Sequence, residues 1–163
     1  MKRRQLTLFV SDKNASEIEI IRQKYNPLQY ELIKSHVTLC REDEILDFEK
    51  ISLNLKNLYQ KPFFINFGLV KRFSENNGVL LPSIGKNKEF HGLRRKILAG
   101  ITPNPRNHEP HITLMHPRNS ECTDVIFHEI EAVKFPSQIL FNKISLIEQE
   151  EGEKWQVLEE FEL

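Results

Sequence analysis

The segment His36–Leu39, with the sequence HVTL, recurs 75 residues later as HITL at His111–Leu114. With six His and five Thr in 163 residues, random placement predicts about 0.2 cases of a Thr two positions after a His. Two cases occur, and a Leu follows each of them. Alternate side chains of an extended strand share a face. Each copy is therefore expected to present its His and Thr together and to bury its two apolar residues.

Two such segments facing each other across a groove would supply a base, an acid and two neutral hydrogen-bond donors. This set suits phosphodiester chemistry. One neutral His can take a proton from an attacking water or hydroxyl, while a second, protonated His gives one to the departing ribose oxygen. The hydroxyls of Thr38 and Thr113 can donate to the non-bridging phosphate oxygens. The scheme needs no metal, and we expect no cofactor.

The two His-x-Thr-x motifs resemble the signature of the two-histidine (2H) phosphoesterases, including the 2'-5' RNA ligase and cyclic phosphodiesterase group. The resemblance covers nearly the whole chain, because a strand and helix precede the first motif and a strand pair near Trp155 follows the second. It implies that His36 and His111 are the acid and the base, in either order, and that Thr38 and Thr113 bind phosphate.

The resemblance also implies the fold. We expect an α+β, bilobal 2H phosphoesterase-like fold, in which two pseudo-symmetric antiparallel sheets line a central groove with helices outside. Residues 1–163 are expected to form a single bilobal domain, since this length suits one domain with two small lobes.

Charge and composition restrict the partner. Lys plus Arg and Asp plus Glu both total 23, so no global positive field is present to hold a long polyanion. We expect the partner to be a nucleotide or an RNA end that carries a cyclic phosphate, and we expect no binding along an extended nucleic acid. The two Cys fit no metal spacing, no apolar run approaches a membrane span, and residues 1–5 lead into no signal-peptide core. These features predict a cytoplasmic protein without a membrane partner.

The pattern along the chain predicts alternating strands and helices. The first helix is expected to begin at an N-cap, either Asn14 or Ser16 with a Glu19 capping box, and to end at Asn26–Pro27. Further helices are expected from Asp43 to Pro62, over 88–99 and over 120–133. Strands are expected at 5–10, 35–40, 63–70, from 79, after Pro110, and at 138–148 and 154–162, with turns at 76–78 and at 151–152. In the strand at 63–70, alternate apolar residues from Phe63 to Leu69 should share one buried face.

Several further side chains are candidates for substrate binding. Arg41 lies five residues after His36, where many family members carry an Arg, and the position equivalent to Arg41 is His116, with Arg118 two residues beyond. These three residues could contact the phosphate. Among aromatic residues, Phe73, Tyr30 and Phe9 could stack on a base.

Three alternative interpretations remain for neighbouring residues. His108, His111 and His116 could be read as a metal cluster, but no familiar ligand spacing accompanies them, and we predict no metal. Cys40 shares the face of His36 and could be a nucleophile, although a small buried filler is the better interpretation. The run at 94–96, Arg-Arg-Lys, is predicted to be a solvated helix face.

The resulting hypothesis is a metal-independent phosphoesterase that hydrolyses 2',3'-cyclic phosphates at RNA ends or on nucleotides, with reversible 2'-5' RNA ligation. A 2'-5' phosphodiesterase and an ADP-ribose cyclic phosphate hydrolase are alternatives that use the same groups. A non-catalytic nucleotide or RNA-end binding module is a third alternative, against which both intact motifs argue.

Overall fold

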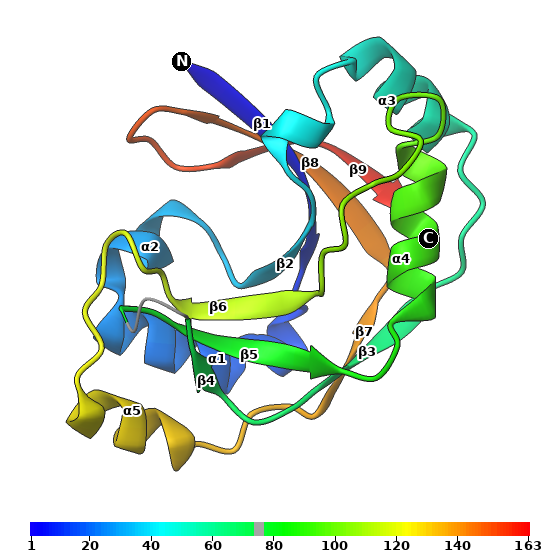
Figure 1. Ribbon diagram of the computed structural model, residues 1–163. Helices are drawn as coiled ribbons and strands as arrows, with labels where there is room; N and C mark the ends of the chain where they lie inside the picture. The colour runs from blue at the N-terminus through cyan, green and yellow to red at the C-terminus, as the bar shows by residue number, and fades with distance from the viewer. Residues whose placement is uncertain (74–76) are drawn as a thin grey trace.

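The computed structural model describes residues 1–73 and 77–163 (Figure 1). Within these residues a strongly curled antiparallel sheet is combined with short helices, which confirms the predicted α+β class. The strands are β1 (Lys2–Phe9), β2 (His36–Cys40), β3 (Phe63–Phe67), β4 (Lys71–Arg72), β5 (Val79–Ile84), β6 (His111–Met115), β7 (Gln138–Phe141), β8 (Lys143–Glu150) and β9 (Gln156–Glu162). The helices are α1 (Asp12–Tyr25), α2 (Pro27–Leu32), α3 (Phe48–Lys56), α4 (Lys88–Ile97) and α5 (Asp124–Glu131), with a 3-10 turn η1 (Glu42–Glu44).

The strand order divides the sheet into two halves that meet at the motif strands. The order is β7-β3-β5-β6-β2-β1-β8-β9, with β4 beside β5. Figure 1 shows β2 and β6 at the centre of the curl. The two predicted sheets are therefore halves of one continuous sheet, joined where β2 pairs with β6.

The motif strands follow the predicted alternation. The apolar members are buried and the His and Thr are half-buried on the other face; the buried residues are Val37, Leu39, Ile112 and Leu114. Burying each such aliphatic side chain contributes roughly 1.5–3 kcal/mol. Because a slip of one residue would exchange the two faces, this burial fixes which side chains face outward.

The two longest helices, α1 and α4, each pack against the half of the sheet opposite to the strand that they follow. Helix α1 follows β1 in one half of the sheet but packs against β6 in the other half, and α4 follows β5 but packs against β2. The predicted apolar side of α4 is confirmed, since Phe90, Leu93 and Ile97 are fully buried. In the described parts of the chain, no helix has the length and apolar character that crossing a membrane requires.

The first two predicted helices differ from those observed. Helix α1 begins at Asp12, after Ser11 at its N-cap, so both predicted N-caps, Asn14 and Ser16, are wrong. Pro27 ends α1 as expected but also occupies the first position of α2, where its missing N–H costs nothing.

The helix predicted from Asp43 is divided in two. Residues 42–44 form η1, and α3 begins only at Phe48, where the side chain of Asp47 accepts a hydrogen bond from the Lys50 N–H. The break follows Glu44, whose carboxylate points inward to an ion pair with Arg94. A tertiary contact has therefore replaced the local helical pattern.

The predicted strands also need two corrections. The segment at 138–148 splits at Asn142, so that β7 pairs with β3 while β8 pairs with β1 and β9. The strand predicted at 63–70 ends at Phe67, and Leu69 is exposed rather than buried. The predicted hairpin is present, since Arg72 pairs with Val79; Asn76 of its predicted turn lies outside the described residues.

Candidate active site

A pocket of about 680 Å³ lies over β2 and β6. The four motif side chains His36, Thr38, His111 and Thr113 all line it. Predicted substrate-binding residues lie around the same pocket, namely Arg41, Phe73, His116 and Arg118. Arg41 reaches it because β2 ends at Cys40, so strand alternation no longer sets its direction.

The register of the motif strands relates the two motifs by a local two-fold axis. Val37 pairs with Ile112, and these residues hold equivalent positions in the two motif copies. Antiparallel pairing about this point places each His across from the Thr of the other motif. A phosphate bound between the strands would therefore meet one imidazole and one hydroxyl from each side.

Both catalytic candidates have the same hydrogen bond at the ring nitrogen away from the pocket. His36 Nδ1 lies 2.8 Å from the carbonyl oxygen of Lys34, and His111 Nδ1 lies 3.2 Å from that of Glu109. A carbonyl can only accept, so Nδ1 carries the proton in each ring. The Nε2 atom of each His is therefore left for proton transfer, as an acceptor when the ring is neutral and as a donor when it is charged.

The surroundings favour neutral imidazoles in the free protein. Burial lowers the pKa of His36 to about 4. The hydrogen bond to the Lys34 carbonyl opposes this shift, whereas the charge of Arg22 adds to it. Burial also lowers the pKa of His111, and Lys71 adds to the effect. An anion in the pocket would act in the opposite direction on both rings.

A buried ion pair from α1 holds the backbone that enters β2. Arg22 is only 2% exposed, pairs with Glu19 and donates to the carbonyl of Ile33 at 2.7 Å. Glu19 accepts from the backbone N–H of Ser35, also at 2.7 Å. The residue directly before His36 is thereby fixed to α1. The spacing of Glu19 and Arg22 is a sequence signal for this ion pair, but nothing in the pattern predicted its burial.

Asn26 fixes the backbone that leaves the second motif. Its Oδ1 accepts from the His116 N–H at 2.7 Å, and its Nδ2 donates to Asn119 at 2.9 Å. His116 Nδ1 accepts from the Arg118 N–H at 3.1 Å, which leaves this nitrogen without a proton. Burial lowers the pKa of His116, and the charges of Arg118 and Arg3 do so further. His116 thus enters the pocket as a neutral ring.

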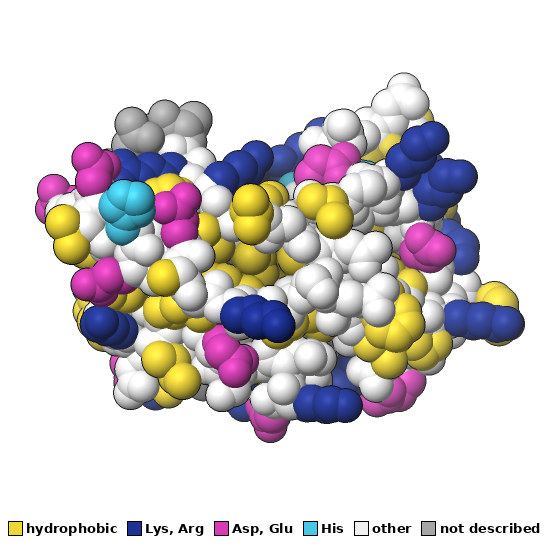
Figure 2. All heavy atoms as spheres, turned by 90° about the horizontal axis from the view of Figure 1, so that it is seen from below, with side chains coloured by type: hydrophobic (Ala, Val, Ile, Leu, Met, Phe, Trp, Pro, Cys, Tyr) yellow, Lys and Arg dark blue, Asp and Glu magenta, His cyan; other side chains and the backbone are white. Residues whose placement is uncertain are grey.

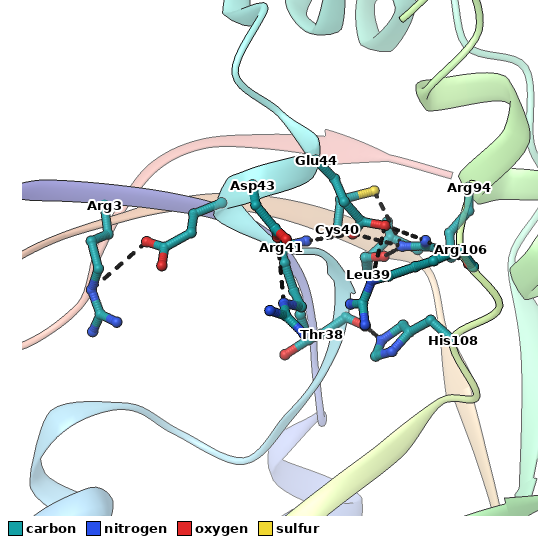
Figure 3. Close-up of polar contacts among 11 residues, drawn as sticks. Arg3, Thr38, Leu39, Cys40, Arg41, Asp43, Glu44, Arg94, Arg106 and His108 are labelled. Carbon is teal, nitrogen blue, oxygen red and sulfur yellow. Dashed lines mark hydrogen bonds and ion pairs between the residues drawn. The ribbon is translucent and has the colours of Figure 1, made fainter. Parts of the chain in front are cut away.

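A second buried ion pair lies at the other end of β2 (Figure 3). Arg94 of α4 is 2% exposed, pairs with Glu44 and donates to the carbonyl of Leu39. Arg94 was predicted to lie on a solvated helix face, and that prediction is wrong; the neighbouring Arg95 is exposed as expected. Since Glu44 offers it a buried carboxylate, Arg94 can be desolvated with its charge balanced.

His108 links the two motif segments. Its Nε2 donates to the backbone carbonyl of Thr38 at 2.9 Å, as Figure 3 shows. Burial lowers the pKa of His108 to about 4, so the ring that donates is neutral. Across the described residues, no three His, Cys, Asp or Glu side chains gather in a way that could hold a metal ion.

Comparison with known protein families shows that the sequence model of the 2'-5' RNA ligase superfamily matches residues 10–153, which include both motifs. The chain belongs to this superfamily. It is 25% identical to the Bacillus cytotoxicus protein named "Putative phosphoesterase Bcer98_0945" over 164 residues, covering 97% of this chain and 95% of that protein. The predicted membership of the 2H phosphoesterases is thereby confirmed, and the chain is a phosphoesterase-type enzyme by family.

Solved structures with the same fold include proteins from two bacteria. E. coli LigT in apo form has a TM-score of 0.72 at 17% identity, covering 99% of this chain and 97% of LigT. LigT complexed with 3'-AMP has a TM-score of 0.69 at 17% identity, with 99% and 98% covered. The Thermus thermophilus protein TT0787 has a TM-score of 0.63 at 17% identity, with 99% and 97% covered. At these identities the likeness is one of fold.

In this superfamily member the aromatic candidates lie at different sites. Phe73 lies edge-on to His111, with ring centroids 6.0 Å apart, and lines the pocket. Phe9 lies edge-on to His36 at 6.2 Å, but it lines a neighbouring cavity of about 820 Å³, as does Tyr30. Trp155 lines both cavities. Of the three predicted stacking residues, only Phe73 lines the same pocket as the four motif side chains.

Cys40 is a small buried side chain of the core, as the preferred interpretation of the sequence predicted. The thiol is fully buried, and burial raises its pKa to about 12. A thiol held in this form is a poor nucleophile.

The pocket is far more basic than the chain as a whole. Five arginines line it, whereas Glu42 is the sole acidic residue among the described residues that do so; the arginines are Arg3, Arg22, Arg41, Arg106 and Arg118. Sequence reasoning missed two of these arginines, the half-buried Arg3 and the exposed Arg106. Arg3 precedes the predicted start of the first strand, and Arg106 lies in a proline-rich loop without periodicity. An anionic ligand is the electrostatic complement of this lining.

Proposed function

We propose that this enzyme opens 2',3'-cyclic phosphates at RNA ends or on nucleotides, without a metal cofactor, and that it joins a 5'-hydroxyl to the same phosphate in 2'-5' ligation. The observation that carries the proposal is the matched pair of imidazoles. His36 and His111 each have Nδ1 committed to a carbonyl two residues earlier and Nε2 left for the pocket that both line.

In hydrolysis, His36 is the base. Its Nε2 takes a proton from water as the water oxygen attacks phosphorus. The bond between phosphorus and one ribose oxygen breaks, and His111 Nε2 gives its proton to that oxygen. The product is a phosphomonoester, and the two imidazoles have exchanged protonation states. We assign the base to His36 because Arg22 and burial both disfavour its charged form.

Thr38 and Thr113 stabilise the transition state in this scheme. Each hydroxyl donates to a non-bridging phosphate oxygen as negative charge builds up there, and removing one such donor typically costs about 2.7–4 kcal/mol. In ligation a 5'-hydroxyl takes the place of water, and departure of the 3'-oxygen leaves a 2'-5' linkage.

The charges of the pocket and the superfamily support the proposed substrate class. A pocket lined by five arginines suits a phosphate, and LigT, whose fold is similar, has been solved with 3'-AMP. Outside the pocket the surface seen in Figure 2 mixes cationic, anionic and apolar side chains, with Lys and Arg concentrated along its upper rim. We therefore propose a small nucleotide or an RNA end as the partner, in the cytoplasm, rather than a long nucleic acid.

The test is a product-resolved assay on four substrates with one preparation. These are adenosine 2',3'-cyclic phosphate, a 2'-5' dinucleotide, ADP-ribose cyclic phosphate, and an RNA with a cyclic phosphate end mixed with a 5'-hydroxyl RNA. We expect the first to yield a single phosphomonoester. The double variant H36A/H111A is the control for contaminating activity.

Each alternative has its own outcome in the same assay. Turnover confined to the dinucleotide or to ADP-ribose cyclic phosphate would replace the proposal with the corresponding activity. Measurable 3'-AMP binding without turnover of any substrate would identify a binding module instead.

A further inference from the structure

Arg106 lies in the loop between α4 and β6, and its role is not explained by the motif chemistry. Its side chain is 39% exposed and lines the pocket that holds His36 and Thr38. Its Nε lies 3.4 Å from Oε1 of Glu44. Among residues 1–73 and 77–163, its two terminal amino groups make no hydrogen bond. The fork of this guanidinium is therefore left for a ligand.

Glu44 already has a full partner in Arg94. Both carboxylate oxygens of Glu44 accept from Arg94, at 2.5 and 3.1 Å, and its side chain is only 9% exposed. Burial opposes ionisation of Glu44, but hydrogen bonds from Arg94 and the Arg41 N–H hold its pKa at about 2. Glu44 is thus a carboxylate at any working pH. One carboxylate between two guanidinium groups leaves a net charge of +1.

The surplus charge is on the pocket side of the cluster. Arg94 is buried against the Leu39 carbonyl, whereas Arg106 is the exposed member. Figure 3 shows the Arg106 side chain extending past Glu44 toward Thr38 and His108. A bidentate pair with Arg94 satisfies Glu44 without Arg106, so a second arginine adds little to that ion pair. It adds instead an oriented cation beside the Thr38 strand.

We propose that Arg106 is a substrate-binding residue that donates its terminal N–H groups to phosphate oxygens next to Thr38, and that Glu44 is its positioning residue. The inference deepens the proposed function and rests on it for the phosphate-bearing ligand. A planar guanidinium held at Nε presents two parallel donors to two phosphate oxygens, which a Lys ammonium cannot do.

Calorimetric titration of the full chain with 3'-AMP tests the first part, with adenosine as the phosphate-free probe. R106Q should weaken 3'-AMP binding at least about tenfold, the range of a charge-assisted hydrogen bond, and R106K should recover only part of the loss. R95Q is the matched control, because Arg95 is an exposed arginine of α4 that does not line the pocket. R106Q affinity within about twofold of wild type would overturn the assignment.

A double-variant cycle tests the role of Glu44. E44Q should weaken 3'-AMP binding in the wild-type background and have no further effect in the R106Q background, since a positioning residue acts through its partner. Equal losses in both backgrounds would refute the positioning role. If the Gln variant does not fold, E44D, which keeps the charge and shortens its reach, serves the same cycle.

The two proposals fail in different ways. A protein that binds 3'-AMP through Arg106 but leaves every cyclic phosphate intact refutes only the proposed turnover. A protein that hydrolyses cyclic phosphates with an unchanged KM in R106Q refutes only the role of Arg106. A wild type without measurable affinity for 3'-AMP overturns the Arg106 inference directly.

Discussion

Val37 and Ile112, equivalent residues of the two motifs, are direct partners across β2 and β6. In an antiparallel pair, equivalent residues can face each other only at a two-fold axis, so the axis that relates the motifs passes between these side chains. The consequence is chemical. Each half of the sheet supplies one imidazole and one hydroxyl, and neither half holds all four of the proposed catalytic groups.

Replacing either of the proposed catalytic histidines should remove most turnover. H36A and H111A are each expected to lower kcat by roughly 10²–10⁴-fold on adenosine 2',3'-cyclic phosphate, the usual contribution of one acid or base. T38S, which keeps a hydroxyl, should lose less. Circular dichroism and thermal unfolding should match wild type, because both His are half-buried at the pocket rather than in the core. Near-wild-type rates in both alanine variants would disprove the site assignment.

Activity should survive exhaustive chelation. Two imidazoles and two hydroxyls provide the proton transfers and the phosphate donors that the scheme requires. The measurement is the rate after EDTA treatment and gel filtration, compared with the rate after Mg²⁺, Mn²⁺ or Zn²⁺ is restored. A large rescue by any of these ions would contradict the scheme.

The dependence of kcat/KM on pH should be bell-shaped, with its optimum below pH 6.5. His36 must be neutral, so activity is lost as pH falls through its lowered pKa of about 4. His111 must be protonated, so activity is lost as pH rises through its pKa, which is also lowered. The optimum of kcat should lie at higher pH, because bound phosphate raises both pKa values.

The two limbs of that profile belong to a coupled pair of rings, so H36A and H111A should each remove one limb from the residual activity. A rate that rises to an alkaline plateau with no falling limb would leave a single-base mechanism in place of the acid–base pair.

His108 should make folding stability depend on pH. Its pKa is about 4 when folded and near 6.5 when unfolded, so between these values the unfolded chain binds more protons and stability falls as pH falls. H108Q keeps a donor for the Thr38 carbonyl but cannot titrate. Thermal unfolding from pH 7.5 to 4.5 should therefore show a smaller decrease for H108Q than for wild type.

H108F is the companion variant. It leaves the Thr38 carbonyl without its donor and should lose about 1–3 kcal/mol at pH 7.5, where H108Q stays close to wild type. Identical pH slopes for wild type and H108Q would show that His108 does not cause the acid sensitivity.

The motif strands were predictable from sequence because their signal is periodic and local. Val37, Leu39 and their counterparts alternate with polar residues, and burial of one face follows directly. The recurrence of His-x-Thr also predicted which side chains would share a pocket.

The supporting contacts were not predictable, because they join residues far apart in the chain. Glu44 and Arg94 are 50 positions apart, and His108 and Thr38 are 70 apart. Each of these residues is of a type that is common in exposed helices or loops, so the local sequence predicts a solvated position for it. The same cause broke the helix predicted from Asp43, where Glu44 is committed to Arg94 rather than to its own helix.

The place of β1 in the sheet determines when the site can form during synthesis. β1 pairs with β2 on one side, but on the other side Lys2 pairs with Glu150, and β9 lies beyond β8. The half of the sheet that carries His36 therefore stays incomplete until residues past 156 have left the ribosome. Pairings this distant in sequence slow folding and leave the β1 edge open to other chains in the meantime. A nascent chain stalled before β8 has both motif strands but lacks the strand that pairs with the other edge of β1.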